Sequence, residues 1–122
     1  MMKPIPIAIA ALCLTGWSLL CPVLAADADQ GLARVTELAQ VNGQALACQD
    51  MDAVAKAKKL MLAHAPKTPR YGNAFEEATN AAYLAQVRGT APCPDAVVLA
   101  SKLDALAKQL QAELPAIPTG TQ

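Results

Sequence analysis

The sequence predicts an all-α protein, a small four-helix bundle-like domain with one disulfide. Three observations favour this fold class. Apolar residues recur every three to four positions through much of the chain, which is the period of an α-helix. After residue 25 there is no alternating run of β-branched residues that would predict a strand. Residues 26–122 suffice for one domain with a small core.

The first 25 residues have the layout of a secretory signal peptide. Lys3 precedes a long apolar run, and Val23 and Ala25 occupy positions −3 and −1 of a cleavage point before Ala26. We therefore expect cleavage after Ala25 and a periplasmic or secreted protein.

Two alternatives to cleavage stay open. The apolar run is nearly long enough to span a bilayer and could be retained as an anchor, although no basic residues follow it. The other alternative is lipidation at Cys13 or Cys21. Leu precedes each of these cysteines, where bacterial lipoproteins usually have Gly, Ala or Ser.

The charge balance argues against two classes of partner. Cleavage would remove Lys3 and no acidic residue, so the formal net charge would fall from 0 to −1. A near-neutral domain lacks the basic surface of nucleic-acid-binding proteins and the polybasic cluster that holds proteins on anionic membranes. We expect no nucleic-acid partner and no membrane span after cleavage.

Cys48 and Cys93 remain after cleavage, and they predict one structural disulfide. Exported proteins meet an oxidising compartment, and closing the loop between these cysteines would contribute about 4 kcal/mol at most. A metal-binding or redox-active thiol pair is the alternative. The chain has no C-x-x-C motif and a single histidine, so the residues favour the structural disulfide.

The first helix is expected from about Gln30 to Cys48. Gly43 lies in its middle, where glycine costs about 1 kcal/mol relative to alanine. We expect a neighbouring helix to pack closely against Gly43. The apolar stripe of this helix comprises Leu38, Val41, Ala45 and Cys48.

A second helix is expected from Met51 to His64, with Asp50 or Asp52 as the N-cap. His64 falls in the last turn, where a histidine interacts favourably with the helix dipole. This capping role is favoured over a metal site. If the protein carries a metal, the candidate ligands are His64, Met51 and Met61.

A third helix is expected to begin at Asn73, with Asn73 as the cap and Glu76 completing a capping box. It should end at Arg88, because Gly89 is a typical residue after a helix. The connection 65–72 contains two prolines and is not expected to be helical throughout.

The fourth helix is expected to have Pro94 in its first turn. Asp104 and Lys108 should form an i,i+4 pair on its exposed side. Its apolar stripe is the clearest in the chain and comprises Leu99, Leu103, Leu106, Leu110 and Leu114. The helical domain is thus expected to span 26–114, with a disordered tail at 115–122.

The residues of the chain form no recognisable catalytic constellation. Ser101 is the only serine after position 25, and it falls on an exposed-looking helical position. Glu76 and Glu77 are adjacent, so their side chains project about 100° apart on a helix. There is no phosphate-binding loop, zinc motif or haem attachment motif. We expect a protein that is not an enzyme and needs no cofactor.

The strongest local candidate for partner binding is the loop and helix start around residues 67–75. Arg70, Tyr71 and Phe75 are the candidate side chains, because Arg and aromatic residues are enriched in protein interfaces. The alternative is that Tyr71 and Phe75 fill the end of the bundle.

The arrangement resembles pilotins, the small helical partners of type II secretion secretins. The matching features are an opening helix from Leu32 to Cys48, an alanine-rich middle with aromatic residues, and Cys93 near the last helix. The resemblance implies a disulfide-linked bundle that clasps a helical secretin segment in a groove between helices. It carries over no binding residues, and the chain departs from the family in lacking a typical lipid-acceptor signal.

A similar pattern is seen in periplasmic immunity proteins that block type VI secretion toxins. The sequence therefore favours an exported helical protein-interaction module that binds a segment of an envelope or secretion-system protein. Two alternatives remain open: an immunity protein that neutralises a toxin enzyme, and a carrier of a small ligand or metal.

Overall fold

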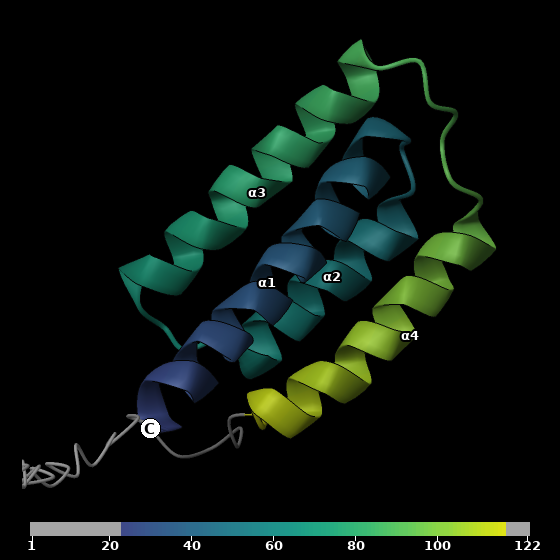
Figure 1. Cartoon of the computed structure of the whole chain (residues 1–122). Helices are drawn as coiled ribbons and strands as arrows, with labels where there is room; N and C mark the ends of the chain where they lie inside the picture. The colour runs from purple at the N-terminus through teal and green to yellow at the C-terminus, as the bar shows by residue number, and fades with distance from the viewer. Residues whose placement is uncertain (1–22, 117–122) are drawn as a thin grey trace, which may run out of the picture.

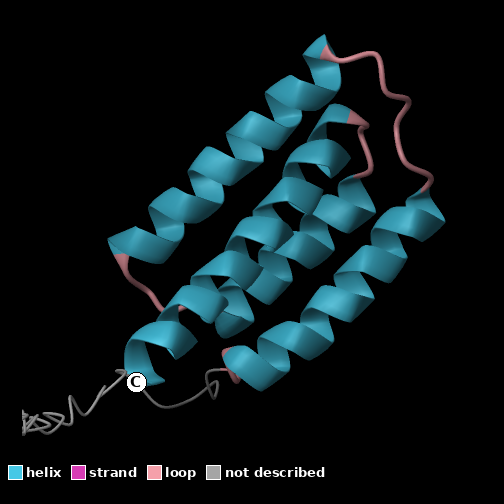
Figure 2. Cartoon of the chain, viewed as in Figure 1, coloured by secondary structure: helices cyan, strands magenta, loops and turns pink. Residues whose placement is uncertain are grey.

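The computed structural model describes residues 23–116, with side chains from Gln30 onward. Within this range the chain forms four helices and no strand (Figure 2). The helices are α1 (Val23–Ala47), α2 (Met51–His64), α3 (Pro69–Arg88) and α4 (Ala96–Glu113). The predicted all-α class is confirmed. The expected signal peptide and the end of the expected tail lie largely outside the described residues.

The four helices run alternately up and down, with α1 in the middle (Figure 1). On one side of α1 lie α2 and α4, which also contact each other. On the other side lies α3, which runs parallel to α1. Within the described residues, the backbone of α3 comes close to neither α2 nor α4. The bundle is therefore a three-helix core with α3 attached to one face.

The main hydrophobic core lies between α1, α2 and α4. The leucine stripe of α4 supplies its largest side chains, since Leu99, Leu103 and Leu110 are completely buried. Val54 and Ala57 of α2 complete it opposite α1. The predicted inward face of α4 is confirmed, and burying leucines contributes about 1.5–3 kcal/mol each relative to exposed side chains. None of the fully buried residues of this cluster, among those described, belongs to α3.

A smaller cluster closes the end of the bundle near the start of α3. It consists of Val35 of α1, Ala65 of the α2–α3 connection and Tyr71 of α3. Phe75 and Met61 are partly buried and pack against both clusters. These residues join the base of α3 to the rest of the fold.

Helix α1 begins at Val23, earlier than the expected start near Gln30. Alanines are frequent between these two positions, and alanine has the highest helix propensity of all residues. The helix ends at Ala47, within one residue of the expected Cys48. Gln49 then adopts a left-handed conformation with φ 59°. The Asp50 N–H bonds to the Ala45 carbonyl at 2.9 Å, which completes a Schellman-type helix end.

Helix α2 has the predicted bounds, and its cap is as expected. The Asp50 side chain accepts a hydrogen bond from the Ala53 N–H at 3.1 Å. This bond satisfies one of the free N–H groups of the first turn. The carboxylate also lies at the positive end of the helix dipole.

The start of α3 differs from the prediction. The helix begins at Pro69 with Thr68 as the N-cap, so Asn73 lies inside the helix rather than at its cap. Pro69 occupies the first turn, where the missing N–H costs nothing and the fixed φ angle favours helix. The connection 65–72 is thus not helical throughout, as predicted, but its second proline begins α3. The predicted end at Arg88 is confirmed.

Helix α4 begins at Ala96 with Asp95 as the N-cap, so Pro94 precedes the helix instead of lying in its first turn as predicted. The structure pairs Asp104 with Lys56 of α2, and not with Lys108 as predicted. The helix period cannot distinguish a partner on the same helix from one on a neighbouring helix. This ion pair links α2 to α4 on the exposed side of the core.

Candidate functional site

A groove runs between α3 and α4, because these two helices do not contact each other and α1 forms the floor between them (Figure 1). Its volume is about 710 Å³, within the usual range for ligand-binding sites. The described residues that line it are Gln40, Gln44, Ala78, Ala81, Ala82, Ala85, Gln86, Ala91 and Lys102.

The α3 wall of the groove is made of alanines. Ala78, Ala81 and Ala85 recur at the spacing of one helical face. Because a methyl group is the whole side chain, this wall is shallow and brings the α3 backbone close to any occupant. Larger side chains at these positions would fill the groove.

The floor of the groove is polar. Gln40 and Gln44 of α1 are one helical turn apart and line the groove together with Gln86 of α3. An amide side chain both donates and accepts hydrogen bonds. The floor can therefore bind polar groups of either kind, including those of a partner backbone.

The α4 wall carries the charge of the groove. Among the described lining residues, Lys102 is the only one with a charged side chain. Val98 precedes it by four residues, so it lies on the same face of α4, and it is 44% exposed. The groove therefore combines an apolar wall, a neutral polar floor and one ammonium group.

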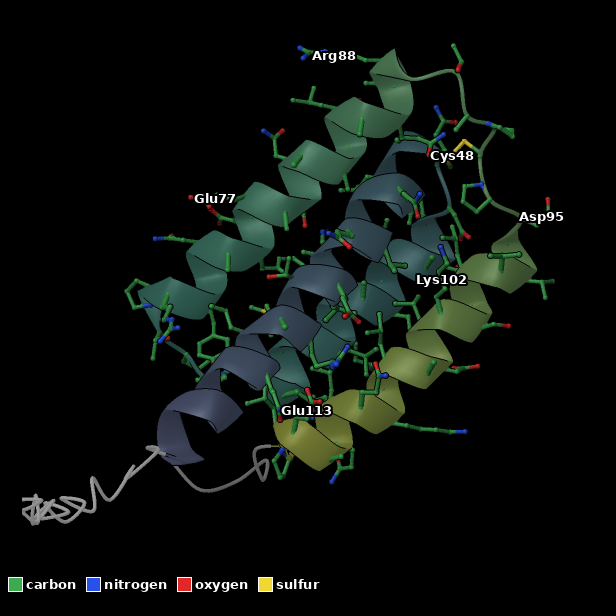
Figure 3. The ribbon with its side chains drawn as sticks, viewed as in Figure 1. Cys48, Glu77, Arg88, Asp95, Lys102 and Glu113 are labelled. Atoms are coloured by element: carbon green, nitrogen blue, oxygen red, sulfur yellow. A yellow bond between two sulfur atoms is a disulfide. The ribbon has the colours of Figure 1, made fainter. Side chains whose placement is uncertain are left out.

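The Cys48–Cys93 disulfide lies at the upper end of the groove (Figure 3). It joins the end of α1 to the α3–α4 connection, and the two Cα atoms are 5.7 Å apart. The predicted pairing is confirmed. Gln86 Nε2 donates to the Ala91 carbonyl at 3.0 Å and lies 3.9 Å from Cys93 Sγ. This end of the groove is thus fixed by one covalent bond and one hydrogen bond.

The opposite end of the bundle is held by polar contacts between α1, α2 and α4. Arg34 Nε donates to both carboxylate oxygens of Glu113 at 3.1–3.2 Å, and its Nη1 donates to Glu37. The hydrogen bonds to Glu113 and then to Glu37 raise the pKa of Arg34 above its ordinary value. Arg34 therefore keeps its charge at any working pH.

His64 is buried and lies at the same end of the bundle. Its Nδ1 is 2.7 Å from the carbonyl oxygen of Leu114. A carbonyl oxygen only accepts, so Nδ1 carries the hydrogen and donates it. His64 thus lies in the last turn of α2 as predicted, and its ring binds the carbonyl at the end of α4.

The metal candidates do not gather into one site. Met51 begins α2 and His64 ends it, which places them about 20 Å apart along the helix. Met61 packs against the hydrophobic clusters. In the part of the chain that the structure describes, no three His, Cys, Asp or Glu residues come together as a possible metal site.

The sequence-predicted binding residues lie at the base of α3, away from the groove. Tyr71 is only 8% exposed and packs on Val35 and Ala65, and Phe75 packs against both hydrophobic clusters. Arg70 is exposed beside them. The structure thus places Tyr71 and Phe75 as the alternative interpretation has them, filling the end of the bundle.

Sequence reasoning missed the groove itself. The recurrence of Ala78, Ala81 and Ala85 was a usable signal, because alanines on one face allow a neighbour to approach closely. Helix periodicity alone does not show that α4 leaves this face uncovered. Whether α4 covers this face depends on where the disulfide holds the α3–α4 connection.

The fold and the groove define a small, disulfide-linked, all-α domain with an open groove between α3 and α4. Comparisons with protein-family models, with curated proteins and with solved structures give no match. None of the described helices combines the length and the hydropathy that a bilayer span requires.

Proposed function

We propose that the protein is an exported protein-interaction module that binds a segment of an envelope or secretion-system protein in the α3–α4 groove. The groove is the observation that supports this proposal most directly. It is open to solvent, bounded by two helices, and large enough for several side chains of a partner. The leader-like first 25 residues support export to the periplasm.

The chemistry of the groove suggests the kind of segment that fits. Small alanines on α3 leave room for bulky apolar side chains, as in helix-in-groove recognition. Lys102 favours an acidic side chain or a terminal carboxylate beside that apolar face. Gln40 and Gln44 can hydrogen-bond polar groups of the same segment. A helix with one apolar face and an adjacent acid meets all three requirements.

Site-specific photo-crosslinking in the exporting cell tests the proposal. Benzoylphenylalanine would replace Ala81, which lines the groove, or Glu77, which is exposed on α3 and points away from α4 (Figure 3). We expect a discrete crosslinked product from position 81 and none from position 77, and we expect Lys102→Glu to weaken it. Equal products at both positions, or none at position 81, would contradict the proposal.

The mass of the crosslinked partner separates the proposal from its main alternative. An envelope or secretion-system component would support the interaction module. An enzyme that attacks the cell wall or lipids would favour an immunity protein instead.

A further inference from the structure

Helix α3 is held to the molecule differently from the other three helices. Its backbone approaches only α1 among the described helices, and Tyr71, near its base, is its only buried residue. The hydrophobic core that joins α1, α2 and α4 is complete without any fully buried α3 residue. Most of α3 therefore lies against the core without contributing to it.

The contact between α1 and α3 is close and is built on small side chains. Gly43 allows the approach, since a Cβ added there would lie 2.7 Å from the Ala82 Cβ and 2.8 Å from the Tyr83 nitrogen. Small side chains of this kind bring backbones together and remove little area from water. The hydrophobic contribution of this contact is therefore low for its length.

The same contact contains a polar network that is incompletely satisfied. Asn42 Nδ2 donates to Thr79 Oγ1 at 3.2 Å, and Thr79 Oγ1 donates to the Ala39 carbonyl at 3.3 Å. Asn42 is 2% exposed, and its Oδ1 has no hydrogen-bond partner in the described structure. A buried acceptor without a partner lowers the stability of the closed arrangement, and water would satisfy it if α3 moved away.

The two ends of α3 are fixed in different ways. The lower end is packed through Tyr71 and Phe75 and connected to α2 by the short segment 65–68. The upper end continues into the exposed connection 89–95, which the disulfide ties to the end of α1. Cys93 is exposed and Cys48 is partly buried.

We propose that α3 is an arm, hinged at its base and latched by the Cys48–Cys93 disulfide. With the latch open, α3 leaves α1 while α1, α2 and α4 remain packed. The arm itself does not depend on the proposed function. Its consequence does: α3 is one wall of the groove, so opening the latch removes that wall and releases a bound segment.

Opening the latch is a two-electron reduction by a dithiol. One thiolate of the dithiol attacks the exposed Cys93 Sγ, forms a mixed disulfide and displaces Cys48 as a thiolate. The second thiolate of the reductant then displaces Cys93 and becomes oxidised to a disulfide. Two protons end on Cys48 and Cys93, which are left as thiols.

Hydrogen exchange of the full exported chain, with and without dithiothreitol, tests the arm. The measurement is made well below the melting temperature of the reduced protein. We expect amides of residues 76–88 to exchange about tenfold faster or more after reduction, while buried turns of α1, α2 and α4 keep most of their protection. Uniform loss in all four helices, or unchanged protection in α3, would overturn the proposal. The Cys48→Ser/Cys93→Ser variant controls for other effects of the reductant.

A second variant tests whether the Asn42–Thr79 contact controls the release of α3, or whether reduction loosens the whole protein. Asn42→Leu with Thr79→Val replaces the polar network by apolar side chains of similar shape. We expect this double variant to retain α3 protection after reduction, because the unsatisfied acceptor is gone. If α3 is released as fast as in the unmodified chain, the contact does not control the arm. The exchange result does not depend on a partner, so it can fail or succeed separately from the crosslink at position 81.

Discussion

Single residues decide how close α1 and α3 can lie. Gly43 allows the two backbones to meet, because any larger residue at this position would force α3 to move. The close packing offsets the low helix propensity of glycine. The expectation of a close helix neighbour at Gly43 is therefore confirmed. The partner helix could not be deduced, because a glycine signals an approach without identifying what approaches.

We predict that Gly43→Ala destabilises the protein by about 1–3 kcal/mol. The added methyl would collide with the backbone of Thr79 and Tyr83, which cannot move without shifting α3. The matched control is Gly72→Ala inside α3, where nothing lies within 4 Å of the added methyl. That change should stabilise by up to about 1 kcal/mol through helix propensity. Urea denaturation of both variants measures the difference, and equal stabilisation by both would refute the close contact.

Among the helices, some ends can be predicted from the sequence and others cannot. α2 has the predicted bounds because Asp50 is a cap at a position where the apolar period also begins. The leucine stripe of α4 likewise determines which face of that helix is buried in the core. The starts of α1 and α3 were predicted too late, since alanines favour extension of α1 and a proline can initiate a helix as well as exclude one.

The N-cap of α2 yields a prediction for that element. Asp50→Ala should destabilise the protein by about 1 kcal/mol, because the Ala53 N–H loses its acceptor. Asp50→Asn removes the charge but keeps a side-chain oxygen, so it should retain most of the stability. Thermal unfolding followed by circular dichroism compares the two. Equal losses would show that charge, and not the hydrogen bond, is what Asp50 contributes.

At the scale of the whole molecule, two different devices hold the ends of the bundle. Arg34, Glu113 and His64 join α1, α2 and α4 at one end by hydrogen bonds. The disulfide joins α1 to the α3–α4 connection at the other, across a sequence separation of 45. Closing a loop of this length contributes up to about 4 kcal/mol, which is a large share of the stability of a small domain.

The fold class and the cysteine pairing could be predicted because they depend on local period and on a single possible connectivity. The groove could not. Its existence depends on which helix faces remain uncovered after packing, and the sequence pattern of α3 does not state that α4 stays away. The binding role expected of Tyr71 and Phe75 illustrates the same limit, since aromatic side chains in a loop can face inward or outward with the same spacing.

We propose that the chain is an exported domain whose helices are joined by the Cys48–Cys93 bond. Intact mass spectrometry of the protein from the exporting cell, alkylated under native and then denaturing conditions without reductant, tests it most directly. We expect a chain that begins at Ala26 and carries no alkyl group. A chain that retains its first 25 residues and gains an alkyl group on both Cys48 and Cys93 would contradict it.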